Sequence, residues 1–218
     1  VKIADLDGNG FIDPGNFAVD DHGDLRIIGN QSPRYRYGVN LSARWNGIGL
    51  SVFLQGVGAR DWYPGSDAGM FWGKYGRPFF ALIPSIHNYT DDMYSAERNN
   101  WDTAYWPRMT TYQSNGTKNW TRLLEIPNTR YIQSAAYLRV KNIQLDYSFP
   151  KHICSAIRLQ GLKIYVNAEN LFTFTPLHKY APNFDPEGLS YDSDFASAAD
   201  GYTYPILKSV TVGVNITF

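Results

Sequence analysis

The N-terminal segment carries oxygen-bearing residues at alternate positions, which is the arrangement of calcium-binding loops. Asp5, Asp7 and Asn9 each offer a side-chain oxygen, and the glycine after Asn9 permits a tight turn. Phe11 can add its backbone carbonyl, and Asp13 stands at the ninth position of the pattern. Hard divalent cations prefer such oxygen ligands, so the segment predicts a Ca²⁺ site, with Mg²⁺ as the second choice.

One position of this loop departs from the expected pattern. Calcium loops of this type end in a carboxylate at the twelfth position, but Asn16 stands there. The alternative interpretation is an acidic turn that holds no metal. Because carboxylates gathered in a short loop repel one another, a bound cation would stabilise the loop.

The segment 59–132 is rich in aromatic residues that lie near Asp, Asn and Arg. Flat rings beside hydrogen-bonding groups suit stacking on sugar faces. The predicted substrate-binding residues are Trp72, Tyr75, Trp101, Tyr105, Trp106 and Trp120. The alternative is that these rings pack the segment together or contact a partner protein, and for any single ring packing is the more frequent role.

No motif of a known catalytic site is present. The sequence lacks Ser-x-x-Lys, Gly-x-Ser-x-Gly, His-Glu-x-x-His and a glycine-rich phosphate loop. The four histidines are scattered without metal-ligand spacing. The chain is therefore predicted not to be an enzyme. The single cysteine, Cys154, cannot form an internal disulfide and is expected to be a small buried hydrophobe.

The elements that must position these residues are β-strands. Five stretches alternate apolar and polar residues with period two, namely 34–45, 48–55, 138–149, 162–169 and 203–218. The residues predicted to face lipid are Val39, Leu41, Leu50, Val52, Ile164, Val166, Val212 and Val214. The residues predicted to face a wet lumen are Arg36, Asn40, Arg44, Gln55, Asn167, Glu169 and Asn215. Because arginines are costly in a dry core, this contrast favours a water-filled barrel.

A soluble β-sandwich with one solvated face, serving as a glycan-binding module, is the competing interpretation. The position of the aromatic residues favours the barrel. Trp45, Phe149 and Phe218 come last on the outward face of three strands that run in one direction. A second group near the opposite ends comprises Tyr35, Tyr37, Phe172, Phe174, Tyr202 and Tyr204. Two such belts are typical of the two interfaces of a membrane barrel.

Composition excludes two classes of protein. The chain has 218 residues and no net charge, which argues against a nucleic-acid partner because such partners require a basic surface. No apolar run approaches the ~18 residues of a membrane-spanning helix. A membrane location therefore requires β-strands.

The connections between strands are unequal in length, which predicts their orientation. Asn46-Gly47 suits a type I′ turn, and 150–160 is also short, so both are placed in the periplasm. The segments 1–32, 59–132 and 173–202 are predicted to be extracellular loops. The alternation slips near Lys141-Asn142, either at a β-bulge or because the strand rises above the membrane there; we expect the second.

Five strands do not close a membrane barrel, since the smallest have about eight. The chain is therefore expected to be part of a larger barrel. Several sequence blocks resemble the C-terminal third of SusC/RagA-like TonB-dependent outer-membrane transporters. They are Asp5-Leu-Asp-Gly-Asn-Gly-Phe-Ile-Asp13, Ile28-Gly29-Asn30-Gln31-Ser32-Pro33, Tyr35-x-Tyr37-Gly38, Asn100-Trp101, Ala104-Tyr-Trp-Pro-Arg108, Tyr137-Leu-Arg-Val-Lys-Asn-Ile143, Glu169-Asn-Leu-Phe172, Tyr204-Pro205 and Phe218.

This resemblance implies a barrel of about 22 strands, of which the chain supplies the last five, with the N-terminal plug and earlier strands outside it. It implies energised import of oligosaccharides, or alternatively of peptides, across the outer membrane of a Bacteroidetes-type bacterium. The implied partners are a SusD-like surface lipoprotein, the TonB complex acting through the absent N-terminal part, and outer-membrane lipids.

The resemblance also places the closing acid of the calcium loop just before an Ile-Gly pair, which here is Asp24. An insertion around 14–23 would explain the departure at Asn16, and Asp20 or Asp21 could substitute. Finally, the C-terminus fits the signal that the barrel-assembly machinery reads, with Thr211, Gly213, Ile216 and Phe218 in the required positions.

Overall fold

The computed structural model of the chain describes residues 4–64, 97–105, 127–182, 184–189 and 205–218. The chain divides into two compact units. One unit holds the long strands and comprises residues 32–60, 134–176 and 205–218. The other comprises residues 1–31, 61–133 and 177–204.

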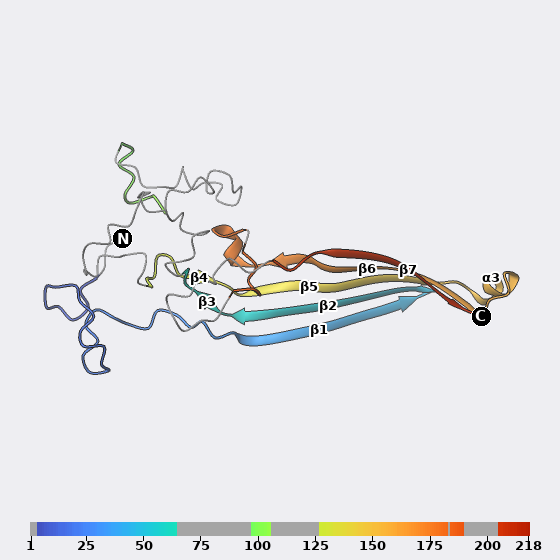
Figure 1. The fold of residues 1–218 in the computed structure, drawn as a ribbon, viewed down its shortest axis with the longest axis horizontal. Helices are drawn as coiled ribbons and strands as arrows, with labels where there is room; N and C mark the ends of the chain where they lie inside the picture. The colour runs from blue at the N-terminus through green and yellow to red at the C-terminus, as the bar shows by residue number, and fades with distance from the viewer. Residues whose placement is uncertain (1–3, 65–96, 106–126, 183, 190–204) are drawn as a thin grey trace. The chain divides into compact units, whose positions relative to one another are not determined.

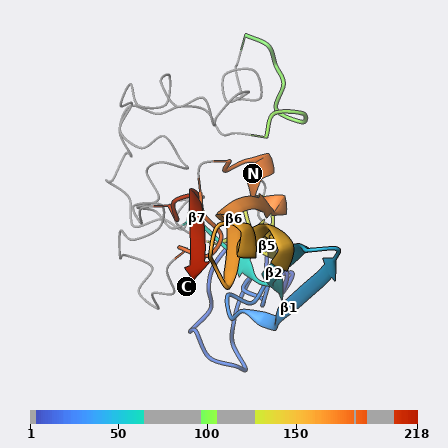
Figure 2. The same cartoon turned by 90° about the vertical axis from the view of Figure 1, so that its right-hand side faces the viewer.

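The strand unit is built on one antiparallel five-stranded sheet with the order β1-β2-β5-β6-β7 (Figures 1 and 2). Its strands are β1 (Arg34–Trp45), β2 (Ile48–Ala59), β5 (Tyr137–Ser148), β6 (Gly161–Phe174) and β7 (Ser209–Thr217). The predicted antiparallel all-β class is confirmed. The sheet is open, with β1 and β7 at its edges, and no sheet among the described residues closes on itself.

The remaining elements of the described part are short. They are β3 (Asp61–Trp62), β4 (Gln133–Ser134), the helix α3 (Lys151–Ala156) and the 3₁₀ turn η2 (Pro176–Lys179). The strands β3 and β4 form a two-stranded sheet. Within the part of the chain that the structure describes, no helix has the length and apolar character needed to cross a bilayer.

The first hairpin follows the sequence prediction. β1 spans the predicted range, and the turn residues Asn46 and Gly47 have φ angles of 47° and 88°. Positive φ at both central positions defines a type I′ turn, whose twist matches that of the two strands. The register is then constant from Trp45 opposite Ile48 to Arg34 opposite Ala59, with no pair at Tyr35, where φ is 57°.

The irregularity in β5 corrects one prediction. We expected this strand to rise above the membrane near Lys141-Asn142, but the structure shows the alternative, a β-bulge. Asn142 pairs with Phe53 and Val140 with Leu54, so Lys141 is the extra residue of the bulge in this register. The bulge returns Val140 to the same face as Ile143, and the apolar face continues past it.

A matching irregularity lies in β6. Asn142 pairs with Glu169, but Val140 pairs with Phe172, so β6 carries one extra residue relative to β5 at this level. Asn170 has a positive φ of 53° there, and its side-chain amide donates to the Leu207 carbonyl at 3.1 Å. The register of β5 and that of β6 are thus displaced at the same level of the sheet.

This displacement explains why the last strand is shorter than predicted. Strand 203–218 was expected, but β7 begins at Ser209, opposite Glu169 and just before the bulge at Asn170. Residues 205–208 lie outside any strand. Pro205 has no N–H with which to extend a ladder.

The short link 150–160 contains the helix α3, which alternation could not reveal. Pro150 precedes the helix with φ −60° and extended ψ. Cys154 is buried, as predicted, and its thiol lies 3.7 Å from the Phe149 carbonyl. The Gln160 N–H donates to the Thr217 carbonyl at 2.9 Å, which attaches the end of the link to β7.

Candidate functional site

The sheet presents two chemically different faces. Leu50 lies opposite Leu145, Leu145 opposite Val166, and Val166 opposite Val212. Residues directly opposite in antiparallel strands share a face. Predicted lipid-facing residues of β2, β6 and β7, joined by Leu145 of β5, therefore form one continuous apolar surface.

This apolar surface is not packed into a core. Its side chains remain open, with Val212 exposed to 73% and Leu145 to 53%. The ends of the strands carry exposed rings, including Trp45 and Phe218 at one end and Phe172 and Phe174 at the other. Tyr202 and Tyr204, predicted for the second belt, lie outside the described residues.

The opposite face is polar, and it contains a charge cluster that the alternation pattern did not single out. Asp146 Oδ1 lies 3.2 Å from Arg44 Nη2 and 3.1 Å from Lys163 Nζ. The Asp146 side chain is only 3% exposed, whereas that of Arg44 is 60% exposed. Gly49 leaves room for this carboxylate, since a Cβ atom there would lie 2.7 Å from Asp146 Oδ2.

The period-two alternation of the strands could have indicated this cluster. Arg44 is one of the predicted lumen-facing residues, and Lys163 in β6 and Asp146 in β5 have the matching phase. What sequence could not supply is the register that places the three strands side by side.

The predicted barrel-assembly residues lie at the C-terminal edge of the sheet. Thr211, Gly213 and Ile216 belong to β7, and Phe218 follows it. Gly213 pairs with Tyr165, whose ring covers it. Gly213 therefore makes room for the Tyr165 ring, a packing role beyond its place in the predicted barrel-assembly signal.

The acidic loop gathers three of the predicted metal-binding carboxylates. Oxygen atoms of Asp5, Asp7 and Asp24 all lie within 4.8 Å of one another. Asp5 and Asp7 are exposed and Asp24 is half-buried. Asp24 is thus adjacent to the start of the loop although it is far away in sequence.

Backbone amides hold these carboxylates in place. The Asp5 carboxylate accepts from the N–H groups of Gly8 at 2.7 Å and Gly10 at 2.9 Å. Both glycines have positive φ, 76° and 84°, so side chains there would be strained. The Gly10 N–H is the main reason why the pKa of Asp5 lies below its usual value, which keeps this carboxylate ionised.

Asp24 closes the loop through two further bonds. Its carboxylate accepts from the N–H of Leu6 and, at 2.9 Å, from the N–H of Asp13. The Asp24 N–H in turn donates to the Asp13 carbonyl at 2.9 Å. The alternative closing residue Asp21 instead bonds the Asn16 side chain through its own carboxylate.

The other predicted ligands are placed differently. Asp13 does not belong to the group of three carboxylates; its Oδ1 accepts from the Gly15 N–H at 2.8 Å. The Asn9 side-chain oxygen accepts from the Phe11 N–H at 2.7 Å, which forms an Asx-turn. Asn9 also donates to Asp7 Oδ2 at 2.9 Å.

Two of the six predicted substrate-binding aromatics lie in the described residues. Trp101 is 72% exposed, so its ring is open to a ligand. Tyr105 is packed: its ring stacks on Tyr180 at a centroid distance of 3.8 Å and meets Tyr131 edge-on at 5.5 Å. Trp72, Tyr75, Trp106 and Trp120 lie outside the described residues.

Polar contacts tie the Tyr105 cluster together. Its hydroxyl accepts from the Gln133 side-chain amide at 2.8 Å, and its carbonyl accepts from the Tyr131 hydroxyl at 3.0 Å. Burial raises the pKa of both phenols, so they stay protonated. These contacts favour a structural role for Tyr105.

The chain is similar to three receptors of the bacterium Formosa agariphila. It is 27% identical to TonB-dependent receptor P3 over 222 residues, which covers 99% of this chain and 19% of that protein. It is 22% identical to TonB-dependent receptor P26 over 221 residues, covering 100% of this chain and 19% of that protein. TonB-dependent receptor P39 is 24% identical over 205 residues, 94% of this chain and 18% of that protein. No family model matches the chain.

Among solved structures, the chain shares its fold with part of the RagAB peptide transporter. The TM-score is 0.56 at 19% identity, covering 89% of this chain and 18% of that one. The RagAB peptide importer in its closed-closed state gives a TM-score of 0.55 at 20% identity, covering 96% and 20% of the two chains. The chain thus spans about a fifth of the length of the proteins that it matches, which are receptors and a transporter rather than enzymes.

Proposed function

We propose that this chain forms part of the wall of a nutrient-import barrel. These relatives confirm its predicted resemblance to SusC/RagA-like TonB-dependent outer-membrane transporters. It lies in the outer membrane, where proteins of this kind reside. It supplies about the last five strands of a barrel of about 22 strands. The plug and the TonB-contacting segment belong to the rest of the transporter.

The observation that carries this proposal is the exposed apolar face of the sheet. A water-facing surface of this kind would be unstable, whereas lipid tails cover it at no cost in hydration. The polar face with Arg44, Lys163 and Asp146 then lines a wet lumen. A β-sandwich would need a second sheet of similar size, and the only other sheet of the described residues has two strands.

Cysteine labelling of neighbouring residues tests the orientation of the two faces. In the intact transporter, Val212→Cys should react with a lipophilic maleimide and resist a membrane-impermeant one. Thr211→Cys, one residue away on the same strand, should show the reverse when the lumen is accessible. Val52→Cys and Ser51→Cys form the matched pair on β2. Equal reaction of both members of a pair with the impermeant reagent would contradict the proposal.

The proposed substrates are oligosaccharides, since the exposed ring of Trp101 offers a flat stacking surface. Peptides are the second candidate, favoured by the fold likeness to the RagAB peptide transporter. A SusD-like surface lipoprotein is the proposed partner at the extracellular side. A ligand screen on the intact transporter with this lipoprotein distinguishes the two classes, and binding of peptides alone would reject the oligosaccharide assignment.

The acidic loop is proposed to bind Ca²⁺, with Mg²⁺ as the alternative. Oxygens of Asp5, Asp7 and Asp24 within 4.8 Å of one another fit the ~2.3–2.6 Å bonds of Ca²⁺, because ligands on opposite sides of one ion are separated by about twice that length. The carboxylates are held by backbone amides without a counter-cation among the described residues. The proposed role of the ion is structural, since it neutralises the loop.

Metal removal tests this assignment. Calcium at about 1 mM should slow amide exchange across residues 5–29 of the intact transporter, and chelation should reverse the effect. Asp7→Asn should weaken the response without unfolding the barrel. Asp20→Asn is the matched control, because Asp20 lies outside the group of three carboxylates. A calcium response that survives Asp7→Asn would refute the assignment.

A further inference from the structure

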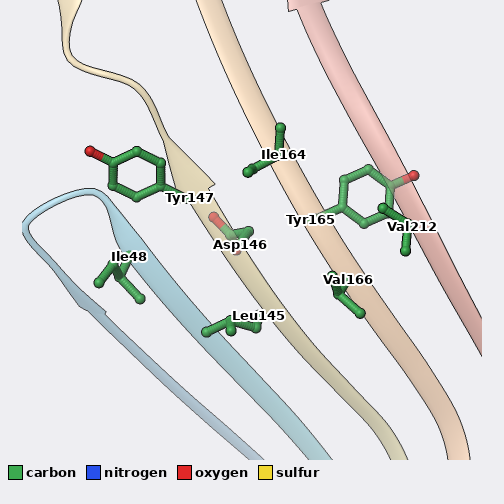
Figure 3. A pocket seen from close by; sticks show the side chains of 8 residues that line it. All are labelled: Ile48, Leu145, Asp146, Tyr147, Ile164, Tyr165, Val166 and Val212. Atoms are coloured by element: carbon green, nitrogen blue, oxygen red, sulfur yellow. The ribbon is translucent and has the colours of Figure 1, made fainter.

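The apolar face of the sheet contains a groove, whose lining side chains Figure 3 shows. Ile48 and Tyr147 place it near the end of the sheet that leads to α3. The groove has a volume of about 330 Å³. Its apolar lining comes from four strands and comprises Ile48, Leu145, Tyr147, Ile164, Val166 and Val212. Asp146 and Tyr165 also border it, but they alternate with these residues along β5 and β6, so their polar groups belong to the other face.

The groove is continuous with α3 through two aromatic residues. The ring of Tyr147 meets that of Phe149 edge-on at a centroid distance of 5.0 Å. The Phe149 carbonyl accepts from the thiol of Cys154, which is buried in α3. The helix is therefore fixed beside the groove.

The link that contains α3 is cationic. Lys151, His152 and Arg158 are all exposed, and no Asp or Glu occurs between residues 147 and 168. The nearest acidic residue in the sequence, Asp146, is already paired with Lys163 and Arg44. Within the described part of the chain, none of the three exposed residues forms an ion pair.

The same link exposes apolar side chains. Ile153 is 39% exposed and Ile157 is 54% exposed, and they are separated by one helical turn. Exposed isoleucines between cations are typical of segments that lie at a membrane surface. A free anion in water would explain the cations but not the isoleucines or the groove.

We propose that this end of the sheet binds an anionic glycerophospholipid, one acyl chain lying in the groove and the phosphate lying against Lys151, His152 and Arg158. The proposal rests on the proposed membrane orientation of the sheet. The apolar lining excludes water around the chain, and the two cations Lys151 and Arg158 supply the complementary charge, with the His152 ring as a further hydrogen-bond donor. Zwitterionic lipid would fill the groove but gain less from the cations.

Lipid retention by the intact transporter tests the headgroup part of the proposal. The protein is placed in nanodiscs containing equal amounts of phosphatidylglycerol and phosphatidylcholine with identical acyl chains. Lipids that remain bound after release into detergent are counted by native mass spectrometry. The wild-type protein should retain phosphatidylglycerol preferentially. In the triple variant K151Q/H152Q/R158Q, the ratio of retained phosphatidylglycerol to phosphatidylcholine should fall by about fivefold or more. The variant K208Q, at the opposite end of the sheet, should keep the wild-type ratio.

A second pair of variants tests the groove. Val212→Trp fills it with an equally apolar side chain and should reduce retention of phosphatidylglycerol. Val39→Trp, on the same face but in β1, should not. Unchanged preference in the triple variant, or unchanged retention in Val212→Trp, would overturn the proposal. Recovery of the transporter in the membrane without any lipid preference would overturn it and leave the proposed function standing, whereas recovery in the soluble fraction would reject both.

Discussion

The ring of Tyr165 covers Gly213 on the neighbouring strand so closely that a Cβ atom at Gly213 would lie 2.3 Å from its Cζ atom. The two residues are direct partners in the β6–β7 ladder on the polar face of the sheet. An aromatic ring that shields a strand glycine compensates for the contacts that glycine lacks. This pair therefore fixes the last strand against its neighbour.

Gly213→Ala should destabilise the folded barrel by about 1 kcal/mol, because the added methyl overlaps the far end of the half-buried Tyr165 ring and displaces it. Urea-dependent refolding into vesicles provides the measurement. Gly161→Ala is the matched control, since a Cβ there would meet Thr217 at 3.5 Å, an ordinary contact. If Tyr165→Ser restores the stability of Gly213→Ala, packing is the cause; if assembly fails regardless of residue 165, the assembly signal is the cause.

Asp146→Asn should lower barrel stability more than Arg44→Gln does. Asp146 is buried and shared by two cations, whereas Arg44 is largely exposed and can be hydrated. The double variant should lose less than the sum of the single losses, because the two changes remove the same ion pair. Glu169→Gln, an exposed carboxylate on β6, serves as the control. Additive losses would show that the ion pair contributes nothing.

Replacing Tyr105 should affect stability rather than ligand affinity. Tyr105→Ala removes a ring that stacks on Tyr180 and meets Tyr131 edge-on, and it should cost about 3–5 kcal/mol in the free energy of unfolding of this unit. Tyr105→Phe keeps the ring and loses only the Gln133 hydrogen bond, about 1 kcal/mol. Trp101→Ala should do the opposite, leaving stability unchanged and weakening oligosaccharide binding. Ligand affinity that depends on residue 105 at constant stability would contradict this division.

The order of the acidic loop should depend on pH. The folded-state pKa of Asp5 is depressed below 3.8, chiefly by the Gly10 N–H, so its contribution is present above pH 3.8 and is lost as pH falls through the folded value. Protection of the Gly8 and Gly10 amides from exchange, corrected for intrinsic rates, is the measurement. Asp5→Asn should flatten this pH dependence. A profile identical to that of the wild type would assign the transition to another group.

The sequence allowed the regular parts of the fold to be predicted because alternation and turn chemistry are local. β1 and the Asn46-Gly47 turn follow the expected boundaries, and the facing of Leu50, Val166 and Val212 agrees with one continuous apolar surface. The bulge at Lys141 could not be predicted in the same way. A change of phase in the alternation fits a β-bulge and also fits a strand that rises above the membrane at that point. Only the register of both neighbouring strands distinguishes the two.

The site residues were less predictable because they depend on contacts between distant segments. Asp24 is adjacent to Asp5 only through loop closure, and its place came from family resemblance rather than from spacing. Tyr105 was chosen for its ring, but its stacking partner Tyr180 is remote in sequence. The helix α3 has six residues, too few for a helical period to be visible.

The burial of Cys154 has a consequence for the redox behaviour of the chain. It is the single thiol in the sequence, and it is only 1% exposed. The compartment that faces the short turns of an outer-membrane barrel is oxidising, so an accessible thiol there would form disulfides between molecules. As long as α3 remains packed against the Phe149 carbonyl, the sulfur is inaccessible to oxidants. The same contact that holds the helix in place therefore protects the chain from intermolecular crosslinking.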